Sequence, residues 1–282
     1  MTAPETPTPP TPEQRKQMTA AVFDRAAASY EQVVPFFTTP GRRLVELAEV
    51  SAGMTVVDLG AGRGAVTLPA AAAVGPHGRV IAGDLAPQMV DLLRADLARA
   101  GMRNVEAHVM DAESPDLPGR SADRVLGAFM IFFLPDPHAA LRRYAQILRP
   151  DGRLGLTIFP GTDDRWTWWG EMLEELKPPQ LPNKPDDPGP VGSPERLAET
   201  LVETGYADIA QTEERHEVVF PDAGRWWDWV WSQGQRAALE QVPAEAIPAL
   251  RSRAFERFAD LARPDGSVVL EQRVTYTLAA PR

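Results

Sequence analysis

The sequence predicts an α/β fold in which helices cover both faces of a mostly parallel sheet. Apolar segments alternate with amphipathic or alanine-rich segments through the first half of the chain, as strands and helices do in this fold class. The apolar run 54–59 ends directly before Gly60, Gly62 and Gly64, where bare backbone can approach a ligand. The next predicted strand ends in Asp84. Because doubly wound sheets bind ligands at the carboxyl ends of their strands, we expect a binding site there.

The N-terminal segment is predicted to form a tail and a helical cap. Residues 1–12 are mainly Thr, Pro, Ala and Glu, which bury too little apolar surface to offset the entropy of ordering, so we expect a disordered tail. Residues 13–50 form the predicted cap. Its first helix starts with a Thr-Pro-Glu segment, in which proline suits the first turn. This helix is expected to continue far enough to place Phe23 and Tyr30 on one face.

Residues 51–160 are predicted to form the core that carries the site. Apolar runs indicate buried parallel strands, and helices with an initial proline or a terminal glycine are expected between them. The expected elements around this core are a helix at 41–50, strands at 54–59 and 79–83, and helices at 67–74 and 87–100, the last closed by Gly101.

Two aromatic insertions interrupt the rest of the chain. Residues 161–195 are rich in Trp and Pro, with a helix expected at 165–177, and long insertions of this kind are often lids or binding loops. Residues 196–282 are predicted to complete the core, with a helical insertion at about 221–263 that bears four tryptophans. The other expected elements are a helix capped by Ser193, strands around 209–220, and an alternating final strand at 268–279.

Composition and charge exclude several function classes. The formal net charge is −10 without a basic patch, which disfavours nucleic acid as a partner. There is no cysteine, which excludes disulfides and thiol chemistry and favours a cytoplasmic location. The chain has no apolar run long enough for a membrane helix and no signal-peptide pattern. We therefore expect an unprocessed cytoplasmic protein that acts on a small molecule, while the oligomeric state is left open.

The chain resembles the class I S-adenosylmethionine-dependent methyltransferases, in particular the small-molecule, UbiE-like branch. The resemblance rests on the sequence VVDLGAGRG at 56–64, Asp84 twenty residues later, the Asp-Ala pair at 111–112, the segment 122–129, and the RPDG turn at 149–152. Residues 22–30 are similar to the FDxxAxxYD stretch of these enzymes. The resemblance implies a Rossmann-like, seven-stranded sheet whose last strand is antiparallel.

The resemblance also implies which residues hold S-adenosylmethionine. Asp84 would hold the ribose hydroxyls, Asp111 the adenine amine, and Asp58 would brace the glycine loop. The other cofactor-binding residues implied are Tyr30 over the cofactor, Gly60, Ala61 and Gly62 along the methionine moiety, Leu85, Met89 and Ala112 around the adenine, and Phe129 beside the sulfonium. Each acid alone also fits a helix cap or a loop brace.

The candidate base and the acceptor wall come from residue types. His138 lies in the first turn of a predicted helix, where the helix dipole favours a neutral imidazole that can accept a proton; a solvated position there is the alternative. His216 is a weaker candidate, His77 is expected in a turn, and His108 is expected to face a helix. Aromatic side chains are expected to wall the acceptor cavity, with Phe37, Phe133, Trp169 and Trp229 as the predicted contacts. No metal is expected.

We therefore predict a methyltransferase of specialised metabolism that acts on a small aromatic or polycyclic acceptor. The acceptor identity and its methylated atom, oxygen, carbon or nitrogen, stay open. One alternative is a protein that uses the cofactor as a structural prop for a cyclisation, a rearrangement or simple binding. Another is a nicotinamide-dependent oxidoreductase, because Gly60, Gly62 and Ala65 also fit G-x-G-x-x-G/A. Asp58, Asp111 and the turn at 150–152 favour the methyltransferase.

Overall fold

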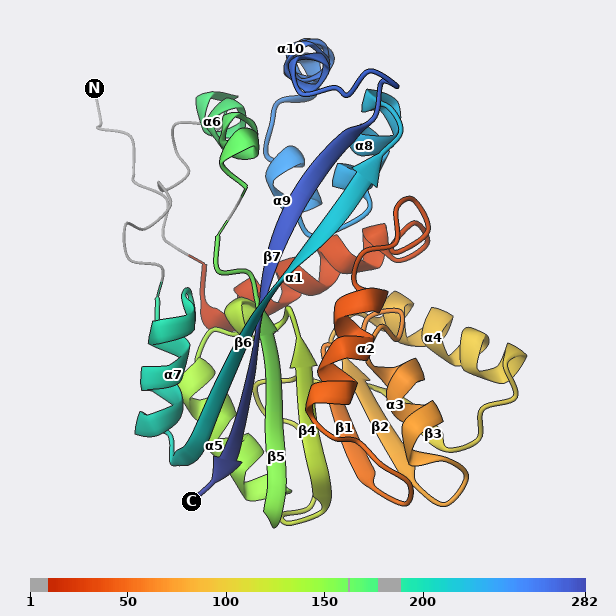
Figure 1. The fold of residues 1–282 in the computed structure, drawn as a ribbon, viewed down its shortest axis with the longest axis vertical. Coiled ribbons are helices and arrows are strands. Elements are labelled where there is room, and N and C mark those ends of the chain that lie inside the picture. Colours follow the sequence, from red (N-terminus) through yellow and green to blue (C-terminus); the bar gives the residue numbers. More distant parts are fainter. Residues whose placement is uncertain (1–9, 162, 177–188) are drawn as a thin grey trace, which may run out of the picture.

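The protein is built around one seven-stranded sheet. The computed structural model describes residues 10–161, 163–176 and 189–282, and its strand order is β3-β2-β1-β4-β5-β7-β6 (Figure 1). Five strands are parallel, and the last strand in sequence, β7, runs antiparallel to β5 and β6. The predicted fold is thereby confirmed. The strands are β1 Thr55–Leu59, β2 Arg79–Asp84, β3 Val105–Val109, β4 Ala122–Ala128, β5 Leu148–Ile158, β6 Tyr206–Phe220 and β7 Val268–Pro281.

Helices cover both faces of the sheet, because successive strand side chains point to opposite sides. Val56 of β1 packs in a cluster with residues of α2 and α3, whereas the next residue, Val57, packs in a cluster with residues of α5 and α7. Both valines are fully buried. The covering helices are α2 Thr38–Leu47, α3 Thr67–Val74 and α4 Pro87–Arg99 on one face, and α5 Pro137–Ile147 and α7 Pro194–Glu203 on the other.

A helical cap stands on the two longest strands. β6 and β7 extend well past the other strands, and Figure 1 shows the cap helices gathered at their upper ends. The N-terminal helix α1, Pro12–Ala26, packs against α4 of the core and α9 of the cap. It therefore lies between the two parts of the molecule. The cap helices are α6 Thr167–Leu176, α8 Ala223–Trp231, α9 Arg236–Leu239 and α10 Ile247–Asp260.

Two helix starts confirm the sequence reasoning. The Thr11 side chain accepts a hydrogen bond from the Gln14 amide, and the Gln14 side chain accepts one from the Thr11 amide, which is a capping box. Ser193 accepts from the Arg196 amide at the start of α7. Of the predicted tail, residues 1–9 lie outside the described part of the chain, as do residues 162 and 177–188 of the predicted insertion.

Other elements differ from the prediction. α1 ends at Ala26, so Tyr30 lies past the helix, although its ring still meets that of Phe23 edge to face at 6.2 Å. Residues 149–152 form an irregularity within β5 instead of a turn before it. The polar face of β7 is also covered in the second half of the strand: Thr275 and Thr277 are buried, and β7 packs against α2 and α7. In the described ranges, no helix has both the length and the apolar character to cross a bilayer.

Candidate functional site

A narrow cavity of about 100 Å³ opens at the carboxyl ends of β1, β2 and β4. The glycine loop after β1 forms its floor. Gly60 has φ +68°, and a Cβ on it would lie 2.7 Å from Cβ of Met130; Gly62 has φ +53°. Both positive angles belong to the left-handed region that favours glycine. The Gly62 amide donates to Oδ2 of Asp84 at 2.8 Å, so the acid that ends β2 is drawn onto the loop.

A second acidic side chain, that of Asp111, also lines this cavity. Asp111, two residues after β3, forms an ion pair with Lys16 of α1 at 2.7 Å, and the same ammonium lies 2.7 Å from Glu113. Burial opposes the charge on Lys16, but the hydrogen bonds with Asp111 and Glu113 raise its pKa overall. Lys16 could not be predicted as a site residue, because its partners lie about a hundred residues away in the sequence. Burial also raises the pKa of Asp84, against the hydrogen bonds from the Ala86 and Gly62 amides.

Most of the predicted cofactor residues line this cavity. Asp58 and Ala61 do not. Ala61 packs into the core beside Val90 and Leu93. Asp58 is 1% exposed and accepts from the Thr67 hydroxyl at 2.5 Å, which connects β1 to the start of α3 across the glycine loop. The predicted residues that line the cavity are Tyr30, Gly60, Gly62, Asp84, Leu85, Met89, Asp111, Ala112 and Phe129.

Asp58 makes the stability of the fold depend on pH. Burial raises its pKa from 3.8 to about 7, Asp84 adds repulsion, and the Thr67 hydrogen bonds oppose the shift. The folded chain therefore keeps this proton up to about pH 7, whereas the unfolded chain loses it near its ordinary pKa of 3.8. The free energy of unfolding falls as the pH rises between these values, and the loss is complete above them.

Replacing Asp58 with asparagine is expected to remove this dependence. One pKa unit corresponds to about 1.4 kcal/mol, and about two units separate pH 5 from the folded pKa of about 7, so the variant should gain about 3 kcal/mol over the parent chain between pH 5 and pH 8. Urea unfolding at both pH values measures the gain, and any pH-independent cost of the amide cancels in the difference. Asp91→Asn, at an exposed position of α4, is the control. If the free energies of unfolding of the variant and the parent chain differed by the same amount at both pH values, the raised pKa of Asp58 would be contradicted.

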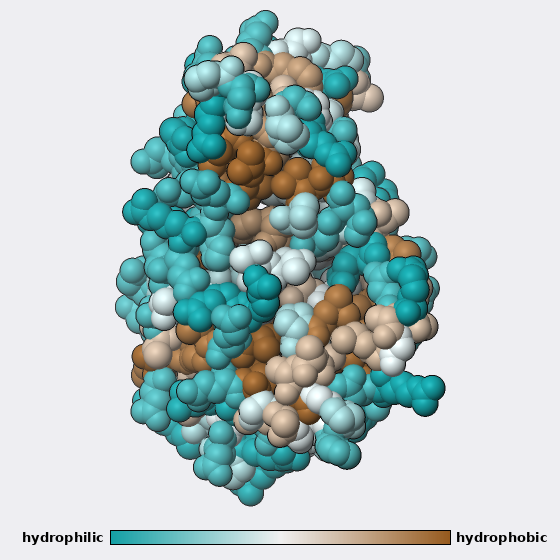
Figure 2. Space-filling model, turned by 45° about the vertical axis from the view of Figure 1, so that its right-hand side comes forward, coloured by the Kyte–Doolittle hydropathy of each residue, from teal (hydrophilic) through white to brown (hydrophobic). Residues whose placement is uncertain are grey.

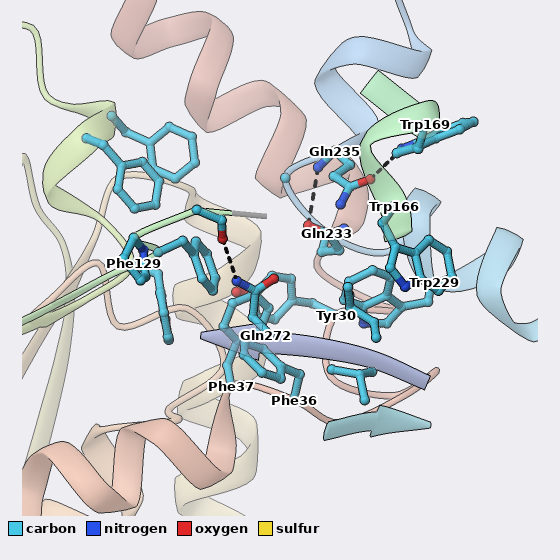
Figure 3. A pocket seen from close by; sticks show the side chains of 18 of the residues that line it. Tyr30, Phe36, Phe37, Phe129, Trp166, Trp169, Trp229, Gln233, Gln235 and Gln272 are labelled. Carbon is cyan, nitrogen blue, oxygen red and sulfur yellow. Dashed lines mark hydrogen bonds between the residues drawn. The ribbon is translucent and has the colours of Figure 1, made fainter. Parts of the chain in front are cut away.

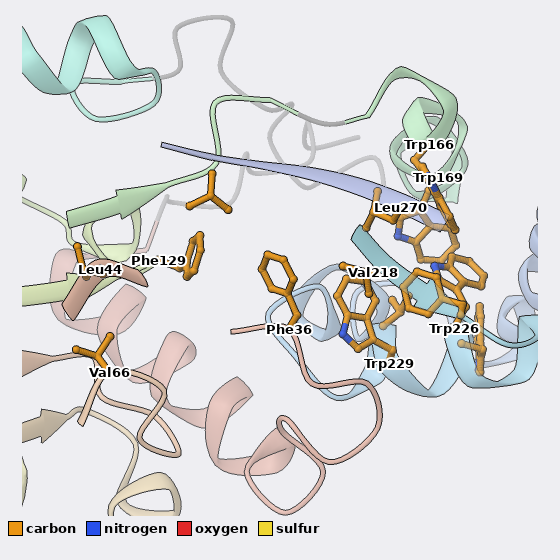
Figure 4. Packing of buried hydrophobic residues seen from close by; sticks show 14 of the residues in the cluster. Phe36, Leu44, Val66, Phe129, Trp166, Trp169, Val218, Trp226, Trp229 and Leu270 are labelled. Carbon is orange, nitrogen blue, oxygen red and sulfur yellow. The ribbon is translucent and has the colours of Figure 1, made fainter. Parts of the chain in front are cut away.

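A larger cavity of about 500 Å³ lies between the core and the cap. Twelve of its 21 described lining residues are aromatic, so flat apolar ligands suit it. Figure 2 shows apolar side chains gathered in a hollow below the cap helices. In Figure 4, Trp166, Trp169, Trp226 and Trp229 crowd the cap end while Phe36 lies between them and Phe129. The four predicted acceptor contacts, Phe37, Phe133, Trp169 and Trp229, all line this cavity.

The two cavities meet at an aromatic collar. Phe23, Tyr30, Phe129 and Phe133 line both of them. Phe129 stacks on Phe159 with ring centres 4.3 Å apart. Its backbone has φ +54°, and its amide donates to both the carbonyl and the hydroxyl of Thr157 at 3.1 Å. Strained backbone of this kind persists where its surroundings fix it, and it clusters at functional sites.

The histidines lie outside both cavities. Nε2 of His138 lies 3.2 Å from Oε2 of Glu203 on α7, so the predicted base faces the second helix layer and lines neither cavity. The ring of His216 contacts the Tyr276 hydroxyl at 2.9 Å, and burial lowers its pKa. His77 lies in a turn, as predicted. His108 is half exposed beside Glu106 on the edge strand β3, so the prediction that it faces a helix is wrong.

Glu31 positions one wall of the large cavity, and the sequence reasoning missed it. Its carboxylate accepts from the amides of Phe36 and Phe37 at 2.9 Å, from the Thr38 amide at 3.0 Å and from the Thr38 hydroxyl at 2.8 Å. These bonds gather the loop that carries both phenylalanines. They also explain why α2 starts at Thr38 instead of residue 41, because the side chain satisfies amides at the helix start.

Replacing Glu31 with alanine is expected to lower the free energy of unfolding by about 3 kcal/mol. Hydrogen bonds to a charged group contribute roughly 1.5–3 kcal/mol each and are not additive. Alanine carries a Cβ as glutamate does, so the strain of the φ of +60° at this position is the same in the variant and the parent chain and does not contribute to the difference. Denaturant unfolding measures the loss. Glu256→Ala, at an exposed position of α10, should change stability by less than about 0.5 kcal/mol, and an equal effect of both variants would refute the role.

Comparisons with known proteins agree with this geometry. Residues 56–152 match the family model described as a methyltransferase domain. The chain is 46% identical to the aklanonic acid methyltransferase DauC of Streptomyces sp. strain C5 over 144 residues, which span 51% of this chain and 65% of that protein. It is 35% identical to the nocamycin O-methyltransferase of Saccharothrix syringae over 242 residues, which span 81% and 86%.

Solved structures match this chain over almost its whole length. The [4+2]-cyclase SpnF superimposes with a TM-score of 0.57, covering 96% of this chain and 97% of that one. The two sequences are 17% identical, so this likeness concerns the fold alone.

Proposed function

We propose, from the premise that this chain belongs to the class I S-adenosylmethionine-dependent methyltransferases, that it methylates a small, flat aromatic acceptor held in the aromatic cavity. The observation that carries the proposal is the collar of four aromatic residues shared by the two cavities. A donor in the small cavity and an acceptor in the large one would meet there. Methyl transfer needs such an in-line approach in a site protected from water.

The residues at the small cavity suit the parts of S-adenosylmethionine. We assign the ribose hydroxyls to Asp84, the adenine amine to Asp111, and the methionine moiety to the bare backbone of Gly60 and Gly62. Leu85 and Met89 offer apolar surface to the adenine. When bound, this cofactor supplies an electrophilic methyl group on a positively charged sulfur. The small volume of the cavity reflects the cover formed by α1 and Tyr30.

The large cavity constrains the acceptor. None of its described lining residues carries a carboxylate, imidazole, ammonium or guanidinium group. The Tyr30 phenol cannot serve as a base near neutral pH, because burial, with repulsion from Glu31 and Asp84, raises its pKa well above 10. We therefore propose an oxygen acceptor that is already ionised in solution, so that His138 has no part in the reaction. The relatives named for aklanonic acid and for O-methylation support this proposal.

Mass spectrometry tests the proposal. The purified chain is incubated with S-adenosylmethionine and a pool of aromatic metabolites that includes aklanonic acid. We expect S-adenosylhomocysteine together with a product heavier by one methyl group. Product formed without S-adenosylhomocysteine would instead support the cyclisation alternative. The nicotinamide alternative is not supported, because the chain belongs to the methyltransferases; the cytoplasmic location and the lack of a nucleic-acid or membrane partner stay predictions.

A further inference from the structure

The acceptor cavity holds a small polar group within its aromatic wall. Apart from tyrosine and tryptophan, its polar lining side chains are three glutamines, Gln233, Gln235 and Gln272. The first two belong to the turn between α8 and α9. Figure 3 shows them on the cap side of the cavity, near Trp169 and opposite Phe129. A few fixed polar groups in an apolar pocket usually set ligand orientation and specificity.

The amide of Gln233 is held in one orientation. Its Oε1 accepts from the Gln235 backbone amide at 3.3 Å, so a flipped side chain would place two donors against each other. Gln235 is fixed in turn, because its Oε1 accepts from the Trp169 indole at 2.7 Å. The other end of the Gln233 amide, Nε2, is buried and has no hydrogen-bond partner among the described residues. The side chain as a whole is 8% exposed.

An unpaired buried donor is costly. A buried polar group without a partner costs about 1–3 kcal/mol, and native proteins keep few of them. The position of this donor suggests what it meets. The neighbouring Gly234 lies against Phe23 and Phe133 of the collar, since a Cβ there would be 3.6 and 3.7 Å from their rings. The turn that carries Gln233 therefore lies beside the part of the cavity where the acceptor would meet the methyl group.

We propose that Gln233 is a specificity-determining residue that donates a hydrogen bond from Nε2 to a carbonyl oxygen of the acceptor. The acceptor class is then a flat polycyclic compound that carries a ring carbonyl, such as a quinone or an aryl ketone. This inference rests on the proposed function, because it assigns the large cavity to the acceptor. It adds a requirement that aromatic walls alone do not impose, since they would hold a plain hydrocarbon equally well.

Calorimetry with two matched probes tests the inference. Anthraquinone-2-carboxylate and anthracene-2-carboxylate share a flat three-ring frame and differ in the two ring carbonyls. Each is titrated into the full chain with and without saturating S-adenosylhomocysteine. We expect the quinone to bind at least tenfold more tightly than the hydrocarbon. The variant Gln233→Met should bring the ratio of the two dissociation constants close to one while the anthracene affinity stays nearly unchanged.

Two further variants make the outcome decisive. Gln233→Leu also removes the donor at a similar side-chain size, so it should abolish the preference even if the methionine variant folds poorly. Gln241→Met, at an exposed position of the same insertion, should leave the ratio unchanged. Equal affinities in the parent chain, no binding of either probe, or a preference that survives both Gln233 variants would overturn the proposal. Failure of the proposed function is distinct, because it would appear as absent methyl transfer or absent binding of S-adenosylhomocysteine.

Discussion

Replacing Asp84 with alanine is expected to weaken the binding of S-adenosylmethionine by about 100-fold or more. The carboxylate lies at the end of β2 and lines the small cavity, where it already accepts from the Gly62 and Ala86 amides. Two ribose hydroxyls donating to a charged acceptor are worth roughly 1.5–3 kcal/mol each, and about 3 kcal/mol corresponds to a factor of 100. Calorimetry with the purified protein measures the change.

A control separates this role from a general effect of charge. Asp91 is an acid on α4 whose side chain is 62% exposed and pairs loosely with Arg94. The Asp91→Ala variant should bind the cofactor like the parent chain. Thermal unfolding of the Asp84 variant without ligand shows whether the loop itself has loosened. If the Asp84→Ala variant kept its affinity, the assignment of this cavity to the cofactor would be wrong.

The variant Gly60→Ala is expected to lose both cofactor binding and several kcal/mol of stability. The new Cβ would lie 2.7 Å from Cβ and 3.0 Å from Cγ of Met130, and neither atom is the free end of a side chain. Overpacking of this kind costs roughly 1–3 kcal/mol, and alanine at positive φ adds about 1 kcal/mol. Relief of the clash would displace the loop on which the methionine moiety is expected to lie.

The chain offers a matched control at Gly53. This glycine has φ +83°, but a Cβ on it would meet nothing within 4 Å. Gly53→Ala therefore carries the backbone strain without the clash, and we expect a loss of about 1 kcal/mol and normal cofactor affinity. Denaturant unfolding and calorimetry on both variants compare the two costs. Equal losses in the two variants would show that Met130 gives way easily and that the loop tolerates a side chain.

Local patterns predicted the parts of the site that follow from strand ends. Asp84 ends β2 and Asp111 lies two residues after β3, and the geometry of a parallel sheet brings such positions to one edge. The glycine loop was recognisable because close approach of backbone needs glycine at particular positions. Aromatic content likewise indicated a walled cavity, although it did not say which tryptophans face the ligand and which only join the cap together.

Residues that act across long sequence separations escaped prediction. Lys16 and Gln233 have partners or neighbours that only the folded chain brings near them, and a lone lysine or glutamine in sequence carries no signal. Glu31 was missed because it caps a loop several residues ahead of it. His138 is a different case: its place at a helix start was predicted, but the structure places it beside Glu203 of α7, and it lines neither cavity.

Helix α1 is held by ion pairs near both of its ends. Near one end, Lys16 forms ion pairs with Asp111 and Glu113 beside the small cavity. At the other end, Arg25 forms an ion pair with Glu240, next to α9 of the cap. A rigid-body movement of α1 away from the small cavity would strain or break the ion pair between Arg25 and Glu240. If the small cavity holds the donor and the large one the acceptor, as proposed, the ion pairs at the two ends of α1 would couple the release of one ligand to the entry of the other.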